Sequence, residues 1–598
     1  MRLAAPTEDS GAAGQRTAAR SLAPSRSQVF WLVTAVTLAG ISLRVFALGH
    51  GLPYQYVPDE STMVGSALRM GSSMSLQPST FIYPALLMYT FAAEFGGIFV
   101  IGRLAGAFES VAAFKEYAFI DPTLFYLLPR LAVALVGVGS IPFAFLVGRR
   151  LYGSTAGIAA AFLLATSVMH VQMSHQARHW VPVGFFTLAI LWVSLNLAER
   201  GRKKDYLYSG LLVGLAAATS FNGFLLMAIP VVAHMVHRRR TGTSLRSLSS
   251  YLPVAGAGAL ALIVFLVLNP YILIQFDRFF AFQSSGERSI GGQIRGHYDD
   301  YLGQFLARQG FTFYGQAMFA YEPAITILGI AGSVLAIRHY PSTALVVLAC
   351  PAFHYFMFST TAPSMEQRYM LPAAVVLALP AGLSVARLLE RLQTWTARFG
   401  GSNLPLTLIA LQMAVIVAIP SLRYDWVLAQ DDTRTLATQW IERNLAPGSD
   451  VAVESYGPHL TPNLATLQQQ QRTDPASLGN RDAWLLEKGL PAGTVGYQVA
   501  RLNLVDTSPY EDRITPYLSN HSHRYFVVSD FRWKSDHQGH LALRRYLARE
   551  ARLVATFAPS SDADYVPSDL LNNLEDPLIE LWKVNRPGPR IEIYEVAR

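Results

Sequence analysis

Cysteine is nearly absent from this 598-residue sequence, and charged residues are scarce. The single cysteine, Cys350, excludes a disulfide framework and any zinc site built on cysteines. Charged residues make up 15% of the chain, against about 25% in typical soluble proteins. This scarcity argues against a soluble multidomain enzyme. Hydrophobic residues at 52% also exclude a disordered protein.

The sequence contains many long apolar stretches. A membrane span needs about 20 mostly apolar residues, and eleven stretches reach or approach that length. They are 29–49, 124–148, 154–171, 181–198, 206–220, 223–237, 251–272, 323–337, 342–359, 370–389 and 404–422. We therefore predict a polytopic α-helical membrane protein with about eleven transmembrane helices.

One further apolar stretch, 81–101, carries Glu94 at its centre. Inner loops of membrane proteins are enriched in Lys and Arg. If 81–101 does not cross the membrane, all the basic clusters lie on the inner side, together with the basic N-terminal tail. If it crosses, the later clusters lie outside. The clusters are Arg149–Arg150, Arg200–Lys204, Arg238–Arg240, Arg338 and Arg387–Arg398. We expect 81–101 to be juxtamembrane or re-entrant, with the N-terminus in the cytoplasm.

This placement explains the net charge of +8 as membrane topology, so we expect no nucleic-acid partner. It also divides the chain into three parts of a multi-pass plasma-membrane protein. Residues 1–28 form a disordered cytoplasmic tail. We expect residues 29–422 to form the transmembrane domain, with outer loops at about 50–123 and 273–322. Residues 423–598, where short helices alternate with strand-like runs, form a soluble extracytoplasmic α/β domain.

Ionisable residues near the predicted outer boundary of the membrane are costly and often functional. The first such segment holds Asp59 and Glu60, directly after Pro58. One interpretation is a helix start, because acidic residues suit the N-terminal helix dipole. The other is a carboxylate that serves as a general base. Adjacent carboxylates also suggest a possible divalent cation, Mg²⁺ or Mn²⁺.

Two later outward segments carry the remaining candidates. His175 and His179 have the spacing of a zinc-protease motif, but Gln176 replaces the glutamate that this chemistry requires. Arg178 runs against the charge bias of outer loops and suits a phosphate. Glu366 and Arg368 precede a span; they either anchor a helix end as a pair or leave a guanidinium to bind a lipid-linked phosphate.

The order of several short motifs resembles the GT-C glycosyltransferases, in particular the protein O-mannosyltransferase and aminoarabinose transferase group (glycosyltransferase family 39-like), over roughly residues 29–390. Asp432-Thr433-Arg434 resembles the opening of the outer domain in bacterial members. The other motifs are Pro58-Asp59-Glu60, Phe81-Ile82-Tyr83-Pro84, Leu128-Pro129-Arg130-Leu131, Gly148–Gly153 and Gln367–Pro372.

The resemblance implies a GT-C fold and a sugar transfer from a polyprenyl-phosphate-linked donor, at a membrane-lipid interface. The acceptor is a hydroxyl of a glycan, lipid or protein on the extracytoplasmic face. Asp59 would be the general base, Glu60 would orient it or help bind the acceptor, and Arg178 and Arg368 would hold the donor phosphate. The further residues expected to bind substrate are Tyr83, His175, His179, Glu366 and Asn222.

Two other functions stay open from the sequence. One is a multi-pass transporter or flippase of a lipid-linked or polar solute. Transporters usually place charges at the bilayer midplane and show structural repeats, whereas here the charged candidates lie at one interface. The other is a non-catalytic assembly subunit whose outer domain binds partners.

Overall fold

The structure of the protein is a computed structural model. It describes residues 24–596, apart from residue 58 and the segments 281–307, 362–364 and 399–403. Short gaps in the C-terminal domain fall at 476–477, 505–513, 515, 519–522 and 563. Most of the expected N-terminal tail, residues 1–23, and most of the expected outer loop at 273–322 therefore lie outside the described residues.

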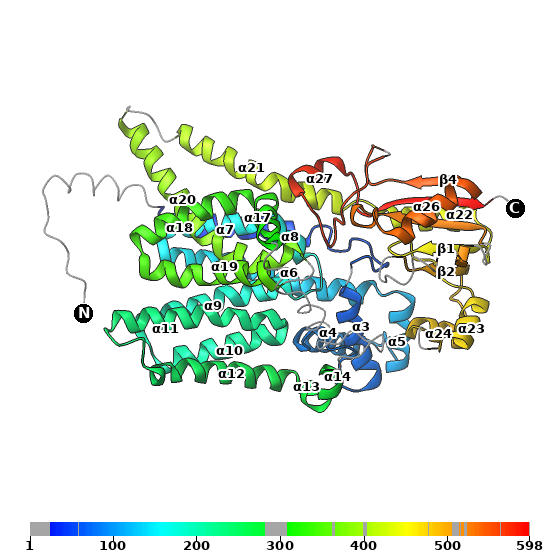
Figure 1. Ribbon diagram of the computed structural model, residues 1–598, viewed down its shortest axis with the longest axis horizontal. Helices are drawn as coiled ribbons and strands as arrows, with labels where there is room; N and C mark the ends of the chain where they lie inside the picture. The colour runs from blue at the N-terminus through cyan, green and yellow to red at the C-terminus, as the bar shows by residue number, and fades with distance from the viewer. Residues whose placement is uncertain are drawn as a thin grey trace, which may run out of the picture.

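Long helices form a bundle along one axis (Figure 1). Each of the eleven predicted stretches is helical. The bundle contains α2 (Arg26–Val45), α6 (Thr123–Tyr152), α7 (Ser154–Ala165), α8 (Val168–Ser174), α9 (Trp180–Arg200), α10 (Lys203–Thr219), η1 (Phe221–Met227), α11 (Ala228–Arg240), α12 (Leu252–Leu268), α17 (Gln309–Tyr321), α18 (Pro323–His339), α19 (Pro341–Thr361), α20 (Leu371–Arg398) and α21 (Leu404–Leu428).

Eight helices of the described chain are long and apolar enough to cross a membrane, or ten if each of two bent helix pairs is one span. The expected number was about eleven, and part of the difference is helix length. α10 has 17 residues and α11 has 13, although each stands within the bundle. The predicted polytopic helical membrane fold is confirmed.

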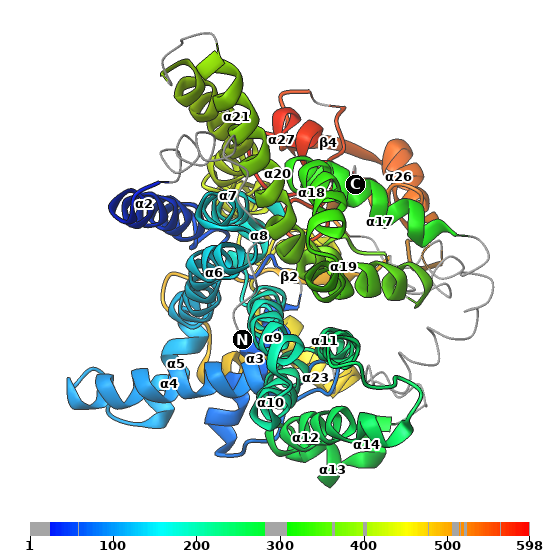
Figure 2. The same ribbon diagram turned by 90° about the vertical axis from the view of Figure 1, so that its left-hand side faces the viewer.

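Three helices of the segment expected to form the first outer loop lie at one end of the bundle: α3 (Glu60–Ser73), α4 (Leu86–Leu104) and α5 (Val111–Ile120). α4 is apolar enough for a span, but it runs across the bundle axis. Figure 1 shows it end-on while α9 and α10 lie in the page, and Figure 2 shows the reverse. The helix α4 therefore differs in direction from α9 and α10, and the juxtamembrane position expected for 81–101 stays a prediction.

The C-terminal domain sits at the same end of the bundle (Figure 1). Its five-stranded sheet has the order β2-β1-β3-β5-β4. β1 is parallel to β2 and to β3, whereas β5 is antiparallel to β3 and to β4. The strands are β1 (Asp450–Glu454), β2 (Gln498–Leu502), β3 (Tyr525–Asp530), β4 (Ala551–Phe557) and β5 (Arg590–Val596).

Helices cover both faces of this sheet, which confirms the predicted C-terminal α/β domain. α22 (Thr433–Asn444) packs on one face through Ala437 and Ile441. α26 (Gln538–Glu550) packs on the other face through Leu543 and Leu547. The peripheral helices are α23 (Leu464–Thr473), α24 (Asn480–Lys488) and α27 (Pro577–Lys583).

The loop before α27 fixes the C-terminal domain to the bundle. Leu570, Leu571 and Leu574 are at most 5% exposed and belong to the main hydrophobic cluster of the bundle. The Gln172 amide donates a hydrogen bond to the Leu570 carbonyl oxygen at 2.9 Å. The Tyr321 hydroxyl donates to the Leu574 carbonyl oxygen at 2.5 Å. The loop of residues 568–575 therefore contributes buried side chains to the hydrophobic core of the bundle.

Small residues allow the bundle helices to approach closely. A Cβ atom added at Gly332 of α18 would lie 1.7 Å from the carbonyl oxygen of Pro380 in α20. Small residues at helix contacts are a common device of membrane proteins, because they let two backbones meet.

We expect Gly332→Ala to destabilise the protein by about 1–3 kcal/mol, as overpacking of a filled core does. The matched control is Gly256→Ala in α12, where a Cβ atom would meet nothing within 4 Å. Thermal unfolding of both variants in detergent measures the difference. Equal melting temperatures would contradict the close contact between α18 and α20.

Candidate functional site

A buried salt bridge joins Glu60, the first residue of α3, to Arg130 of α6. Arg130 donates to Glu60 Oε1 from Nε at 2.8 Å and to Oε2 from Nη2 at 2.7 Å. Its Nη1 also donates to the carbonyl oxygens of Leu48 and His50, at 3.0 and 2.8 Å. The Ala177 amide donates to Glu60 Oε1 at 2.7 Å. Glu60 therefore faces the protein interior and ties three segments together.

Asp59 turns in another direction, although it precedes Glu60 directly. Its backbone is left-handed, with φ of 68°, which is uncommon for a residue other than glycine. Its carboxylate accepts a hydrogen bond from Arg178 Nη2 at 2.5 Å and is 27% exposed. Asp59 is the N-cap residue of α3, but its side chain makes no capping hydrogen bond, so the carboxylate does not cap the helix.

The two arginines expected to bind phosphate converge on one atom. Arg178 Nη1 and Arg368 Nη1 donate to the side-chain oxygen Oδ1 of Asn572, at 2.9 and 3.0 Å. Arg368 Nη1 also bonds Glu366 Oε2 at 2.9 Å. Both arginine Nε atoms are buried and have no hydrogen-bond partner among the residues that the structure describes. The two guanidinium groups thus share the Asn572 side-chain oxygen as an acceptor, and each also pairs with one carboxylate, Asp59 or Glu366.

Aromatic rings surround this cluster. His179 lies 5.4 Å from Tyr83 and 4.3 Å from Trp180, measured between ring centroids. The Arg368 guanidinium lies 5.9 Å from the centroid of Trp180. These contacts bring Tyr83 and His179 to the same place as the two arginines.

Charge fixes the protonation states of the cluster. Burial raises the pKa of Asp59, but Arg178, Arg368 and a hydrogen bond from Tyr83 outweigh it, so the net shift is downward. Burial, followed by the charge of Arg178, lowers the pKa of His179 to about 3. At neutral pH the site therefore combines an ionised aspartate, two guanidinium groups and a neutral imidazole.

Two predicted substrate-binding residues do not join the cluster. His175 is buried, and its ring nitrogens lie 2.9 and 2.8 Å from the carbonyl oxygens of Val171 and Phe46. Asn222 lies in η1, and the described part of the chain shows no hydrogen bond between it and the cluster. The spacing of His175 and His179 along the chain therefore does not unite them in one site.

A divalent cation finds no shared carboxylate pair here. Asp59 is engaged by Arg178, and Glu60 by Arg130. Within the ranges described, no group of three or more His, Cys, Asp or Glu residues is arranged to hold a metal ion. The side-by-side acids of the sequence thus point into two different environments.

Asn572 is the residue that the sequence analysis missed. It is separated from Arg178 by 394 positions and lies in the C-terminal domain. Asp569 shapes its loop by accepting hydrogen bonds from the backbone amides of Leu571 and Asn572. The Gln176 amide donates to the Leu571 carbonyl oxygen. No local motif marks this asparagine, because its role arises from the docking of two domains.

Comparison with solved structures finds similar proteins at low sequence identity. The oligosaccharyltransferase of Archaeoglobus fulgidus is 12% identical, with a TM-score of 0.46, covering 84% of this chain and 70% of that chain. ArnT from Cupriavidus metallidurans bound to undecaprenyl phosphate is 14% identical, with a TM-score of 0.44, covering 96% and 99%. The Pmt1-Pmt2 protein O-mannosyltransferase complex of S. cerevisiae bound to the sugar donor is 19% identical, with a TM-score of 0.31, covering 41% and 34%.

Sequence comparison is more specific. No curated protein matches the chain. Residues 128–269, which include Arg130 and Arg178, match the family described as dolichyl-phosphate-mannose-protein mannosyltransferase. This match covers 142 of the 598 residues, and it agrees with the resemblance to GT-C glycosyltransferases expected from the short motifs.

Proposed function

We propose that this protein transfers a sugar from a polyprenyl-phosphate carrier to an acceptor hydroxyl, on the extracytoplasmic face of the plasma membrane. The observation that carries this proposal is the convergence of Arg178 and Arg368 on one oxygen atom beside the ionised Asp59. The matched family is described by a donor of this class, dolichyl-phosphate-mannose.

The donor phosphate takes the place of the Asn572 amide oxygen between the two arginines. Planar guanidinium groups match phosphate oxygens in bidentate pairs, and a phosphate brings the negative charge that the amide oxygen lacks. The buried Nε atoms of Arg178 and Arg368 supply additional donors. When the bond between the anomeric carbon and the phosphate oxygen breaks, the electron pair stays on that oxygen. The two arginines stabilise the resulting charge.

Asp59 accepts the proton of the acceptor hydroxyl, whose oxygen forms the new bond to the anomeric carbon. In the absence of donor, Arg178 holds the pKa of Asp59 down and makes it a weak base. A bound phosphate shares the charge of Arg178, so the pKa of Asp59 rises towards its usual value. Donor binding thus prepares the base for the second substrate.

The other predicted residues take different places in this proposal. Tyr83, His179 and Glu366 line the cluster and fit a role in binding substrate. Glu60, predicted to orient the base or bind the acceptor, fits the first role through its bonds to Arg130 and Ala177. His175 fits a supporting role in the core, and a role for Asn222 stays a prediction.

The substitution Asp59→Asn tests the assignment of the base. It removes the proton acceptor, and general-base catalysis typically contributes about 10²–10⁴-fold, so we expect transfer of radiolabelled sugar from the lipid carrier to fall at least about 100-fold. Glu109→Gln, at an exposed position of the same outer loop, controls for loss of a carboxylate. Full activity of the Asp59→Asn protein would refute the assignment.

The substitution Glu60→Gln separates support from chemistry. Removing one partner of a buried ion pair costs about 3–5 kcal/mol, so we expect a clear fall in the melting temperature, which Asp59→Asn does not cause. A double variant, Glu60→Leu with Arg130→Met, should recover part of the loss because no charge stays unpaired. If Glu60→Gln abolished transfer at an unchanged melting temperature, Glu60 would act in the chemistry itself.

Substitution of Asn572 tests the donor site by binding alone. Asn572→Asp places a carboxylate between Arg178 and Arg368, so we expect affinity for a polyprenyl phosphate to fall at least about tenfold. Asn572→Ala removes the competing oxygen and should not weaken binding. Asn444→Asp, at the exposed end of α22, is the matched control. Equal affinity of the wild type and the Asn572→Asp protein would place the phosphate elsewhere.

A further inference from the structure

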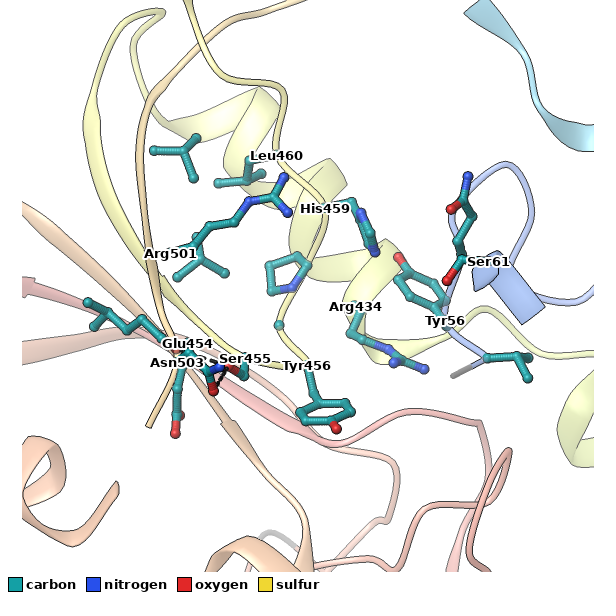
Figure 3. A pocket seen from close by; sticks show the side chains of 17 residues that line it. Tyr56, Ser61, Arg434, Glu454, Ser455, Tyr456, His459, Leu460, Arg501 and Asn503 are labelled. Atoms are coloured by element: carbon teal, nitrogen blue, oxygen red, sulfur yellow. Dashed lines mark hydrogen bonds between the residues drawn. The ribbon is translucent and has the colours of Figure 1, made fainter. Parts of the chain in front are cut away.

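A cavity lies between the segment before α3 and the C-terminal domain (Figure 3). Its volume is about 420 Å³, within the range of about 300–1,000 Å³ that is typical of small-molecule sites. Residues 55–57 and Ser61 form one wall, and residues 453–460 and 499–503 form the other. The cavity therefore adjoins the segment that carries Asp59, from the side of the sheet.

The topology of the sheet favours a ligand at this position. The cavity lies at the carboxyl ends of β1 and β2, which are adjacent and parallel. After β1 the chain turns to the face covered by α22, where Leu460 is buried. After β2 it turns to the opposite face, where Leu504 is buried. Open α/β sheets bind ligands outside the carboxyl ends of their strands.

Among the residues that the structure describes, Arg501 is the arginine of this cavity that has no ion-pair partner. Arg501 lies near the end of β2 and is exposed. Figure 3 shows its guanidinium beside His459. Arg434, by contrast, is paired with Asp432 at 2.7 Å. Glu454 is paired with Lys534 at 3.0 Å, so its charge is neutralised inside the domain.

The remaining groups are flat rings and neutral polar side chains. Tyr56 and His459 lie 5.6 Å apart between ring centroids. Tyr456 has φ of 67°, a strained conformation that tends to occur at ligand clamps. Burial, then Arg501 and Arg434, lower the pKa of His459 to about 4, which leaves this ring neutral. Ser455 and Asn503 add a hydroxyl and an amide.

We propose that this cavity binds a sugar residue that carries an anionic group, a carboxylate or a phosphate, as a subsite for the acceptor. Aromatic rings cover the apolar faces of the sugar, the amide and hydroxyl groups meet its hydroxyls, and Arg501 binds the anion. Its role as an acceptor subsite rests on the proposed function, because Val57 and Ser61 of its wall flank Asp59 and Glu60. The binding of an anionic sugar in this cavity does not depend on the proposed function.

The test uses the full-length protein in detergent, with glucuronate, glucose 6-phosphate and glucose as probes in saturation-transfer NMR titrations. We expect at least one anionic sugar to bind at least about tenfold more tightly than glucose, since only the anionic sugars form a charge-assisted hydrogen bond with Arg501. A preference for glucuronate identifies a carboxylate ligand, and a preference for glucose 6-phosphate identifies a phosphate ligand.

Arg501→Gln should remove this preference, because Arg501 is exposed and its loss leaves no buried partner. Tyr456→Ala should weaken all three sugars. The control is Arg472→Gln, an exposed arginine of α23 outside the cavity. Equal binding of glucose and both anions, or an unchanged preference in the Arg501→Gln protein, would overturn the proposal.

Binding of a polyprenyl phosphate by the same variants separates the two proposals. Arg501→Gln should leave it unchanged, because the donor site contains Arg178 and Arg368 instead. Anionic-sugar binding that depends on Arg501, in a protein without transferase activity, would refute the proposed function alone. Transfer activity without such sugar binding would refute this subsite alone.

Discussion

The buried salt bridge between Glu60 and Arg130 is the contact on which the candidate site depends. It fixes the start of α3 against α6 and holds the backbone amide of Ala177, next to Arg178. Because Glu60 is committed to the interior, Asp59 is left in a left-handed conformation with its carboxylate towards Arg178. Two adjacent acids thereby acquire different roles: one orders the protein and the other stays available for chemistry.

The C-terminal domain completes this arrangement. Its residue 568–575 loop buries leucines in the bundle and places Asn572 between two arginines. Burying two like charges close together is unfavourable unless an acceptor lies between them. Asp59 and Glu366 each pair with one of these arginines, and the Asn572 amide oxygen is the acceptor that both arginines share. The domain also supplies one wall of the cavity beside Tyr56, so both proposed substrate sites depend on its docking.

Composition and charge predicted much of the molecule. All eleven apolar stretches are helices. Ionisable groups near a membrane are costly and need partners. This reasoning selected Asp59, Arg178 and Arg368 as candidate site residues. The sequence did not separate the environments of Asp59 and Glu60, since one backbone angle decides between them. It grouped His175 with His179 by helical spacing, but the helix ends at Ser174. Asn572 had no signal, because only the docking of two distant segments creates its contacts.

The central claim is that Arg178 and Arg368 form the donor phosphate site. The most direct measurement is an experimental structure of the protein with a polyprenyl phosphate bound. This account predicts phosphate oxygens within hydrogen-bond distance of both guanidinium groups, with the Asn572 side chain displaced from between them. A bound phosphate elsewhere, with both arginines still hydrogen-bonded to Asn572, would contradict it.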